Sequence, residues 1–496
     1  MHAQPGFNKV YLLDSCCAES FESLVVDNDT IVVMRTGYDI SVGSWGVNLL
    51  KIDTFGNILE SGFLSDSIVN YIRDSGGNYL VKTPDGGYAF SVTVLNDTAC
   101  PHPCINLAKF NHNLELEFNR HYSAPEPSAY FSANKILALE NGSGFFLLGN
   151  YLDETADLNS FRAALIRADN VGEIQWIREY GLVDTAYLIN NILEINNNTF
   201  LVSGGKAKYG NVVYGEPFDM VLDSLGESVH TWWSPANTGN DKSVAVPNGG
   251  YIQIGTNVIY LSNGSGKTKP YIRRVDSVFT EKWKRYVDVP FIPGGCLYRD
   301  LQITPDSNYI AVGDIPGYWG DNSHTGMSTK ITDSGEVLWE RFDRGRYGSF
   351  TGIMNQLKSV GVLSSGSIVA CGSTWIEEPV AFSEKSWLIK LSPGGCMDDT
   401  DTLDCWAGAT VVDVKKPPPS HTIQVYPNPA QDYVTFEGAI QGDIIITDLL
   451  GREVKRLRMN GLSPAEWRPG EVARGLYVWR QVVDGFVLDV GKIVVE

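Results

Sequence analysis

The stretch from Leu301 to Asp343 reads LQITPDSNYIAVGDIPGYWGDNSHTGMSTKITDSGEVLWERFD. It contains four short apolar runs, LQIT, YIAVG, MSTKIT and VLWERF. A tight turn at Asp306-Ser307 separates the first two runs, a long loop separates the middle two, and a second tight turn at Ser334-Gly335 separates the last two. Short apolar runs bounded by turn residues are typical of strands, so this stretch predicts one four-stranded antiparallel unit.

The same unit recurs along most of the chain. The residues that end the third strand of each copy follow one another at intervals of roughly 55 residues; they are Asp53, Asn111, Asp169, Asp223, Asp276, Thr332 and Ser392. A repeat of this length with four antiparallel strands matches the blade of a β-propeller, and seven copies suit a closed ring. The sequence therefore predicts an all-β fold, with a seven-bladed β-propeller over residues 7–405.

The seventh copy lacks a fourth strand, because LIKLSPGG runs directly into CMDDTDTLDC. The missing piece resembles the N-terminal stretch Phe7 to Tyr11, FNKVY, which is similar to the fourth strands WIREY and WERF of other copies. We expect this N-terminal strand to complete the last blade, which leaves no open sheet edge.

A different composition begins after Cys405. Residues 406–422 contain the run VVDVKKPPPSHT, whose Pro triplet is typical of a stiff linker. Residues 423–496 then alternate short apolar strands with turns, which predicts a small antiparallel β-sandwich.

The C-terminal segment carries several spaced motifs in one order. They are Tyr426-Pro427-Asn428-Pro429, Gly451 within ITDLLGREV, Gly475 and Tyr477 within GLYV, and Gly491-Lys492 close to the C-terminus. This pattern resembles the type A C-terminal sorting domain of the type IX secretion system. The resemblance implies an Ig-like sandwich and a host among the Bacteroidetes. It also implies export from the periplasm across the outer membrane to the cell surface or the medium, with the translocon and its processing and attachment proteins as partners. It implies nothing about what the propeller does.

Charge and composition exclude some classes of function. The chain has 496 residues and a formal net charge of −19, which repels nucleic-acid phosphates. No apolar run approaches the length of a membrane span, so we expect no membrane-spanning segment. The sequence contains no Gly-rich phosphate loop, no H-E-x-x-H, no G-x-S-x-G and no EF-hand loop. We therefore predict no catalytic residue, no cofactor and no metal.

The loops between the second and third strands of the predicted blades are long, and they share one face of the ring with the connections between blades. Binding residues concentrate on loops that a rigid scaffold holds, so this face is the predicted site. Aromatic rings beside acidic residues suit glycans or protein segments. The candidate binding residues are Tyr38, Trp45, Tyr151, Tyr318, Trp319 and Trp375. The alternative is that these rings pack beneath their own loops.

These features predict a secreted or cell-surface binding or adhesion module with a glycan or protein ligand. One alternative is an extracellular glycan-active enzyme, either a propeller glycosidase or a sialidase-like enzyme, and a quinoprotein-like dehydrogenase is a more distant one. The turn Asp333 to Trp339 resembles the Asp-box of sialidases and the tryptophan-docking repeat of quinoproteins, but any blade needs such a turn for packing. A two-carboxylate glycosidase requires paired acids near the axis, and no spacing here predicts such a pair.

The eight cysteines include two pairs that are close in sequence. Cys100 with Cys104, and Cys396 with Cys405, can each close a small loop in an oxidising compartment, so we predict two disulfides. The alternative for the first pair is a metal site with His102, although a closed zinc site requires four ligands and only three are local. The partners of the other four, Cys16, Cys17, Cys296 and Cys371, remain unassigned.

Overall fold

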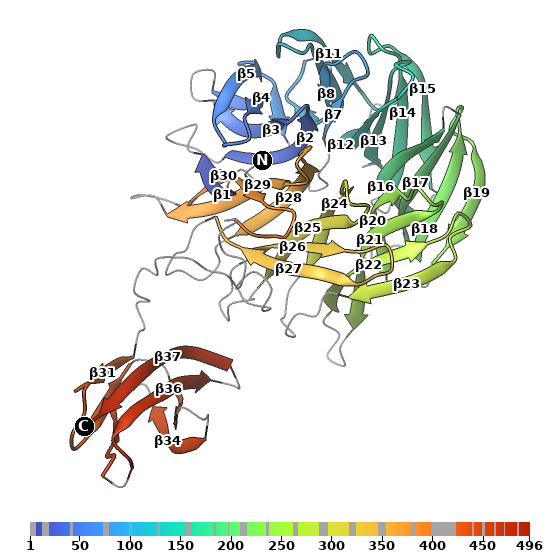
Figure 1. The fold of residues 1–496 in the computed structure, drawn as a ribbon. Helices are drawn as coiled ribbons and strands as arrows, with labels where there is room; N and C mark the ends of the chain where they lie inside the picture. The colour runs from blue at the N-terminus through green and yellow to red at the C-terminus, as the bar shows by residue number, and fades with distance from the viewer. Residues whose placement is uncertain are drawn as a thin grey trace. The chain divides into compact units, whose positions relative to one another are not determined.

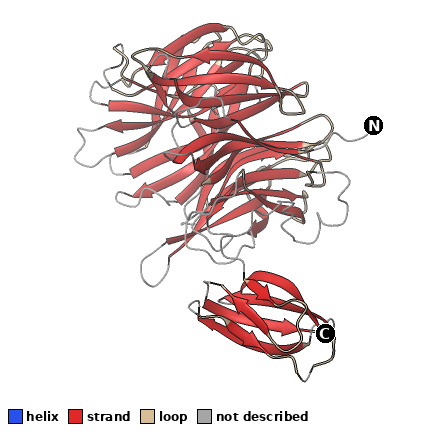
Figure 2. Cartoon of the chain, turned by 90° about the vertical axis from the view of Figure 1, so that its left-hand side faces the viewer, coloured by secondary structure: helices blue, strands red, loops and turns tan. Residues whose placement is uncertain are grey.

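The computed structural model describes residues 6–11, 19–397 and 423–496, apart from short gaps. The gaps are 40–42, 73–78, 99, 101, 126–128, 154–159, 182–184, 197, 209–215, 235–237, 261–265, 287–295, 317–323, 346–353, 378–381, 439–440, 449–451, 461–462, 471 and 484–485. Every described regular element is a strand (Figure 2). Within these residues no helix is long and apolar enough to cross a membrane. The chain divides into two compact units, Met1–Val411 and Val412–Glu496. The predicted linker, 406–422, lies outside the described residues.

The described strands of the first unit form seven antiparallel sheets that are arranged as blades around a common centre (Figure 1). Blade 1 comprises β2 (Glu19–Asp27), β3 (Thr30–Asp39), β4 (Ser44–Ile52) and β5 (Ile58–Leu64). Blade 2 comprises β6 (Asn70–Ile72), β7 (Leu80–Lys82), β8 (Tyr88–Phe90), β9 (Thr93–Leu95), β10 (Cys104–Phe110) and β11 (Leu116–Tyr122). Blade 3 comprises β12 (Ala129–Ala138), β13 (Phe145–Asp153), β14 (Ser160–Ala168) and β15 (Ile174–Tyr180). Blade 4 comprises β16 (Thr185–Asn196), β17 (Thr199–Lys208), β18 (Glu216–Asp223) and β19 (Ser228–Trp233). Blade 5 comprises β20 (Thr238–Ala245), β21 (Tyr251–Tyr260), β22 (Gly266–Val275) and β23 (Glu281–Tyr286). Blade 6 comprises β24 (Leu297–Ile303), β25 (Tyr309–Pro316), β26 (His324–Ile331) and β27 (Val337–Asp343). The last blade has the order β1 (Phe7–Tyr11), β30 (Phe382–Leu391), β29 (Ile368–Glu377) and β28 (Asn355–Val362). The all-β propeller class is thus confirmed.

The turn between the third and fourth strands is built in the same way in several blades. In blade 1 the Asp53 carboxylate accepts hydrogen bonds from the backbone N–H groups of Phe55 (2.9 Å) and Asn57 (2.8 Å), and Gly56 has φ +79°. The turns that begin at Asp169, Asp223 and Asp276 repeat both bonds. An Asp that caps its own turn fixes the hairpin locally, which explains why this residue recurs in the sequence.

The N-terminal strand β1 forms the outer strand of blade 7. It pairs antiparallel with β30, with Phe7 opposite Lys390 and Tyr11 opposite Ser386. The Trp387 indole donates a hydrogen bond of 2.7 Å to the Asn8 side chain across this pair. The two ends of the propeller are therefore joined within one sheet, as the sequence predicts.

Neighbouring blades dock through the same turns. In three blades the turn glycine lies under an aromatic ring of the preceding blade: Gly226 under Trp176, Gly335 under Trp283 and Gly395 under Trp339. A Cβ atom at any of these glycines would lie 2.6–2.7 Å from a ring atom, and each glycine has a positive φ. Only glycine satisfies both the backbone conformation and the close approach.

The apolar core of the propeller is divided into separate clusters, which lie at the interfaces between neighbouring blades. One cluster joins Leu107 of blade 2 to Phe131 and Leu147 of blade 3. Another joins Tyr11 of β1 and Leu388 of blade 7 to blade 1. Because each interface has its own core, the blades form a rigid frame that holds the inner strands in register around the axis.

The second unit contains two sheets. One has the order β31 (Gln424–Tyr426), β32 (Val434–Glu437) and β35 (Ala465–Trp467); the other has the order β34 (Glu453–Asn460), β33 (Gln441–Thr447), β36 (Gly475–Val483) and β37 (Phe486–Val495). Rings from opposite sheets meet in its core, with centroids 5.7 Å apart for Phe436 and Trp479, and 5.6 Å apart for Trp467 and Tyr477. The unit is a small β-sandwich.

Candidate functional site

The first strand of each blade lies nearest the axis, and first strands of neighbouring blades contact one another (Figure 1). In six of the described first strands the pairing with the second strand shifts by one residue. One shift in each of these strands skips a polar residue in the register; these residues are Glu22, Asn134, Asn190, Asp241, Arg299 and Lys358. A second shift in β16 skips Ile195. A β-bulge re-aims one side chain, so these six residues form a repeated set, which we call the axial ring. In blade 2 the corresponding stretch falls in the gap 73–78.

Hydrogen bonds link the inner strands in a circle. At several bulges a backbone N–H of one blade donates to a side chain of the preceding blade, which satisfies a donor that the bulge frees. The links are Leu80 N to Ser23 Oγ (3.3 Å), Ala133 N to Thr93 Oγ1 (2.9 Å), Asn134 Nδ2 to Ile189 O (2.7 Å), Asn190 Nδ2 to Asp241 Oδ1 (3.5 Å), Val360 N to Asp300 Oδ2 (2.8 Å) and Leu24 N to Ser359 Oγ (3.2 Å). Lys242 contacts Asp300 to connect blades 5 and 6. All seven blades thus share one polar circuit.

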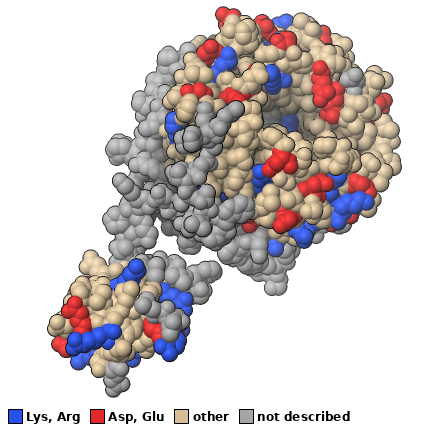
Figure 3. Space-filling view, viewed as in Figure 1, with Lys and Arg blue, Asp and Glu red and all other residues tan. Residues whose placement is uncertain are grey.

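Charged groups of both signs meet at this circuit. Lys358 of blade 7 contacts the Glu22 carboxylate of blade 1 at 3.1 Å. Lys135 of blade 3 donates to the backbone oxygen of Asp241 in blade 5 (3.1 Å), so it passes over the intervening blade. In the space-filling view the middle of the propeller is hollowed, with acidic and basic groups around the hollow (Figure 3). The axis is therefore narrow and polar at this level.

Burial shifts the proton affinities of two of these groups. Desolvation raises the pKa of Asp241 to about 6, although Lys135 and Arg299 lower it in part. Desolvation lowers the pKa of Lys135 to about 7, with help from the charge of Lys242 and against the attraction of Asp300 and Asp241. Both groups therefore change charge near neutral pH, which most lysines and aspartates do not.

A second cluster adjoins Arg299. Asp314 on β25 accepts a hydrogen bond from Arg299 Nε (2.6 Å) and contacts His324 Nδ1 (2.7 Å). Burial by itself would raise the pKa of Asp314, but Arg299 and His324 together hold it below its usual value. The carboxylate stays ionised and holds the Arg299 side chain of β24 and the His324 side chain at the start of β26.

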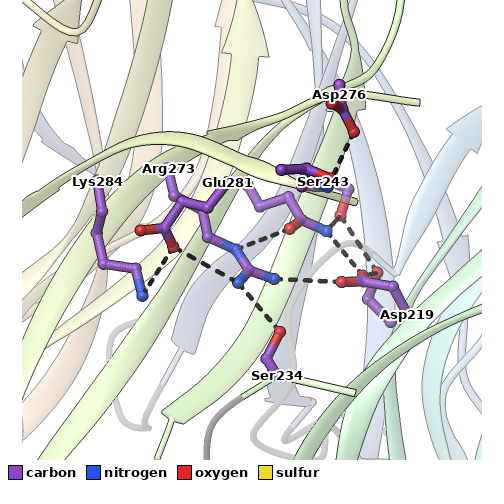
Figure 4. A network of polar contacts seen from close by, with 10 residues as sticks. Asp219, Ser234, Ser243, Arg273, Asp276, Glu281 and Lys284 are labelled. Carbon is purple, nitrogen blue, oxygen red and sulfur yellow. Dashed lines mark hydrogen bonds and ion pairs between the residues drawn. The ribbon is translucent and has the colours of Figure 1, made fainter. Parts of the chain in front are cut away.

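A buried network at the interface of blades 4 and 5 has a different character (Figure 4). Asp219 lies between Arg273 Nη2 (3.2 Å), Gln253 Nε2 (2.7 Å) and Ser203 Oγ (2.6 Å). Arg273 also donates to Gln253 Oε1 and to Ser234 Oγ. Since its buried members bond to one another, we interpret this network as a structural link between blades.

The structure describes four of the six predicted aromatic binding residues. Tyr38 and Trp45 lie opposite each other on β3 and β4, half-buried, with ring centroids 6.1 Å apart. Trp375 on β29 is 37% exposed. Tyr151 is fully buried between Phe131 and Arg162, so it is not at the surface, because β13 continues past it to Asp153. Tyr318 and Trp319 lie outside the described residues.

The cysteines differ in part from the prediction. Cys100 and Cys104 are free thiols in the structure, so the predicted disulfide between them is absent. Their sulfur atoms instead group with the Asp97 carboxylate, and His102 is not part of that group. Cys296 and Cys371 are free and buried. Cys396 is disulfide-bonded, and its predicted partner Cys405 lies outside the described residues.

The motif residues of the second unit cluster around its last strand. Asn428 donates to Lys492 O (2.8 Å) and accepts from Val494 N (2.9 Å), between the two prolines Pro427 and Pro429. Gly491 lies beneath the Trp479 ring, where a Cβ atom would approach a ring atom to 2.6 Å. The other motif residues are Tyr426, whose hydroxyl donates to Glu437 (2.7 Å), Tyr477, whose hydroxyl donates to Ala473 O (2.5 Å), and Gly475 with φ +152°. Gly451 lies outside the described residues.

The fold thus defines an all-β propeller protein with a separate small β-sandwich at its C-terminus. Residues 424–496 match the family model of the secretion system C-terminal sorting domain. The chain is therefore a cargo of the type IX secretion system, which exports it to the cell surface or the extracellular space.

No curated protein matches the chain. Similar solved structures include a protein of unknown function from Dyadobacter fermentans, with 11% identity, coverage of 78% of this chain and 98% of that one, and a TM-score of 0.39. An α-L-arabinofuranosidase of Fusarium graminearum in complex with arabinobiose has 9% identity, coverage of 65% and 97%, and a TM-score of 0.39. The β-propeller domain of the Trilobed protease from Pyrococcus furiosus has 9% identity, coverage of 82% and 96%, and a TM-score of 0.33. At such values these similarities carry no argument about ligand or activity.

The sequence interpretation missed the axial ring. Its signal was present, since aligned first strands such as YFSANKILA, YLINNILEI and NQLKSVGV each carry a polar residue within an apolar context. An alternating strand also places polar residues on its exposed face, so only the shift in pairing shows that these residues share one place.

Proposed function

We propose that the propeller is a binding or adhesion module, displayed outside the cell, which takes a glycan or protein ligand at the mouth of the axial ring. The observation that supports this is the repeated bulge, which places a polar side chain at one level of six inner strands. Three ring members, Asn190, Asp241 and Arg299, are only half-buried. Polar groups that converge in a concave site are the usual determinants of ligand orientation.

The topology places the ring near the face with the long loops. Each inner strand starts from a connection between blades, and that connection lies on the same face as the loop between strands two and three. The bulge is early in β24 and β20, where Arg299 is the third residue and Asp241 the fourth. It lies near the middle of β12 and β16. A ligand on this face would therefore meet the loops and the ring together.

Aromatic side chains on two adjacent blades extend this surface. Tyr38 and Trp45 lie at the loop end of blade 1, and Trp375 lies at the loop end of blade 7. Their rings are half-buried or exposed, in contrast to Tyr151. Ring faces offer apolar area to sugar rings or to apolar side chains, while the axial ring offers hydrogen bonds.

The rival function is a glycan-active enzyme, and one observation favours it. A carboxyl group with a pKa of about 6, such as Asp241, suits a general acid. A glycosidase needs a second carboxylate that faces the same bond. The other acids at this level are engaged, because Glu22 contacts Lys358 and Asp300 accepts from Ser359 Oγ and Val360 N. Binding without turnover is therefore the better-supported function.

The test uses the purified full-length chain on a glycan array and on a panel of extracellular proteins, together with an assay for release of reducing sugar. The proposal expects selective binding and no product. Product release that is abolished in the Asp241→Asn variant, with the variant still folded, would establish the rival function instead.

A further inference from the structure

Two thiols and a carboxylate form a compact cluster in blade 2, in the connection between β9 and β10. The sulfur atoms of Cys100 and Cys104 and a carboxylate oxygen of Asp97 all lie within 4.8 Å of one another. Cys104 is fully buried, Cys100 is 5% exposed, and the Asp97 side chain is 11% exposed. The cluster lies outside the axial ring and does not depend on the function proposed above.

The backbone holds the three groups in place. Cys100 N donates to Asp97 O (3.1 Å), which closes a turn between these residues. Cys104 is the first residue of β10 and pairs with Val94 of β9. Ser123 donates a hydrogen bond of 3.2 Å to the Cys100 sulfur. Backbone pairing and hydrogen bonds therefore hold the two thiols and the carboxylate close together.

A chain of hydrogen bonds that ends at His121, here called the relay, orients the Asp97 carboxylate. The backbone N–H of Val92 donates to Asn106 Oδ1 (2.8 Å), which turns the Asn106 amide nitrogen toward Asn119 Oδ1 (2.9 Å). The Asn119 amide nitrogen lies 3.0 Å from His121 Nε2. Because an amide nitrogen only donates, Nε2 accepts and the ring proton sits on Nδ1, which lies 2.5 Å from Asp97 Oδ2.

We propose that Asp97, Cys100 and Cys104 bind one divalent metal ion of the zinc class. Zinc prefers thiolate, imidazole and carboxylate ligands, with Zn–S bonds of about 2.3 Å, so ligand atoms around it stand ~3.7 Å apart. The cluster meets this spacing with small side-chain movements. Binding forms two sulfur–metal bonds and one oxygen–metal bond and releases the two thiol protons to solvent. Three protein ligands leave the fourth tetrahedral position to water or to an external ligand.

The relay distinguishes this site from a simple disulfide. A bridge between Cys100 and Cys104 would use neither Asp97 nor His121, whereas a metal ion would engage the Asp97 carboxylate that the hydrogen bonds through Asn119 and His121 hold in place. Metal-ligating groups are generally held by hydrogen bonds of this kind, and loss of such an orienting group typically weakens binding 10- to 100-fold.

The test compares the full-length chain with four variants after incubation with Zn²⁺ and dialysis. Metal content is measured by inductively coupled plasma mass spectrometry, and Co²⁺ loading is followed by its thiolate charge-transfer absorption. The chain itself should retain one zinc per molecule. The variants Asp97→Asn and Cys104→Ser should lose it, and His121→Phe should bind 10- to 100-fold more weakly. The matched control Cys296→Ser, which removes a buried free thiol in another blade, should retain it.

Non-reducing mass spectrometry of the chain secreted into the medium shows whether Cys100 and Cys104 form a disulfide instead. A Cys100–Cys104 disulfide without metal would overturn the proposal, and so would equal zinc content in the chain and in Asp97→Asn. Melting curves of each variant show whether a loss of metal reflects loss of the fold. Asp97→Asn keeps the shape of the side chain, so it remains informative if Cys104→Ser is unstable.

Discussion

The Tyr11 hydroxyl donates a buried hydrogen bond of 2.9 Å to the carbonyl oxygen of Gly56. Tyr11 belongs to the strand that completes blade 7, and Gly56 lies in the turn of blade 1. Tyr122 and Tyr180 make the same bond, each at 2.7 Å, to Gly172 and Gly226 of their own next blades. The closing interface of the ring therefore uses the same contact as interfaces within it.

This contact predicts matched effects on stability. Tyr122→Phe removes the tyrosine donor from a buried carbonyl, and Tyr11→Phe leaves the Gly56 carbonyl only the longer bond from Lys9 Nζ (3.3 Å). Each loss costs about 1–3 kcal/mol. Urea unfolding of both variants should show similar decreases in the free energy of unfolding. A clear loss for Tyr122→Phe with none for Tyr11→Phe would mean that the N-terminal strand does not close the ring in solution.

The turn glycines predict a difference between two alanine substitutions. Gly226 has φ +78° and lies under Trp176, whereas Gly86 has φ +87° and has open space around its Cβ position. Gly86→Ala should cost about 1–2 kcal/mol from backbone strain alone. Gly226→Ala should cost a further 1–3 kcal/mol or so, because the added methyl displaces the ring. Equal costs in thermal or urea unfolding would contradict the docking of blade 3 on blade 4.

The pair Lys135 and Asp241 predicts a pH dependence of stability. Asp241 has a folded pKa of about 6, above its unfolded value, so its contribution is full below pH ~4 and is lost as pH rises through 6. Lys135 has a folded pKa of about 7, below its unfolded value, so its contribution returns as pH rises from about 7 to 10. The pair is therefore least favourable between about pH 6 and 7.

Variants isolate this effect from other titrations. Relative to the unmodified chain, Lys135→Met should be more stable by a few kcal/mol near pH 6.5, with the difference shrinking toward pH 10. Asp241→Asn should abolish the decline in stability between about pH 4 and 6 that this carboxyl causes. If the difference in unfolding free energy between each variant and the unmodified chain does not vary with pH, burial does not shift the pKa values of Lys135 and Asp241 in the predicted directions.

Loss of the Asn428 side chain should reduce export. This side chain bonds to both Lys492 O and Val494 N, so it ties the motif loop to the last strand of the sorting domain. Asn428→Ala removes both bonds and should destabilise this unit by about 1–3 kcal/mol. The secreted fraction of the variant in the native host should fall, and chain should accumulate in the periplasm. Arg468→Gln, which removes only an exposed ion pair with Glu466 outside the motifs, is the control and should be exported normally.

The sequence predicted those features that repeat or that are fixed locally. Capping Asp, Asn, Ser or Thr residues recur at a regular interval, and a glycine follows most of them, so the blades could be counted. FNKVY could be matched to other fourth strands in the same way. The site could not be found in this way. The polar character of Asp241 or Asn134 marks no function until a pairing shift places it on the axis.

Other errors have equally local causes. Tyr151 follows an apolar run and was assigned to a loop, but pairing from β12 to β14 continues beyond it and keeps its ring in the core. Cys100 and Cys104 are close in sequence, which suggested a bridge. The participation of Asp97 and His121 depends on contacts with β11 that no local spacing reveals.

The most direct test of the account is the affinity of the full-length chain for the ligand selected on the arrays, measured by isothermal titration calorimetry. Asn190→Ala and Asp241→Asn alter half-buried members of the axial ring, while Glu115→Gln alters an exposed turn residue of blade 2. The account predicts that each ring variant binds roughly 10-fold or more weakly, as loss of a hydrogen bond to a charged or buried partner requires, while Glu115→Gln binds as the unmodified chain does. Unchanged affinity in both ring variants, with both variants still folded, would contradict ligand binding at the axis.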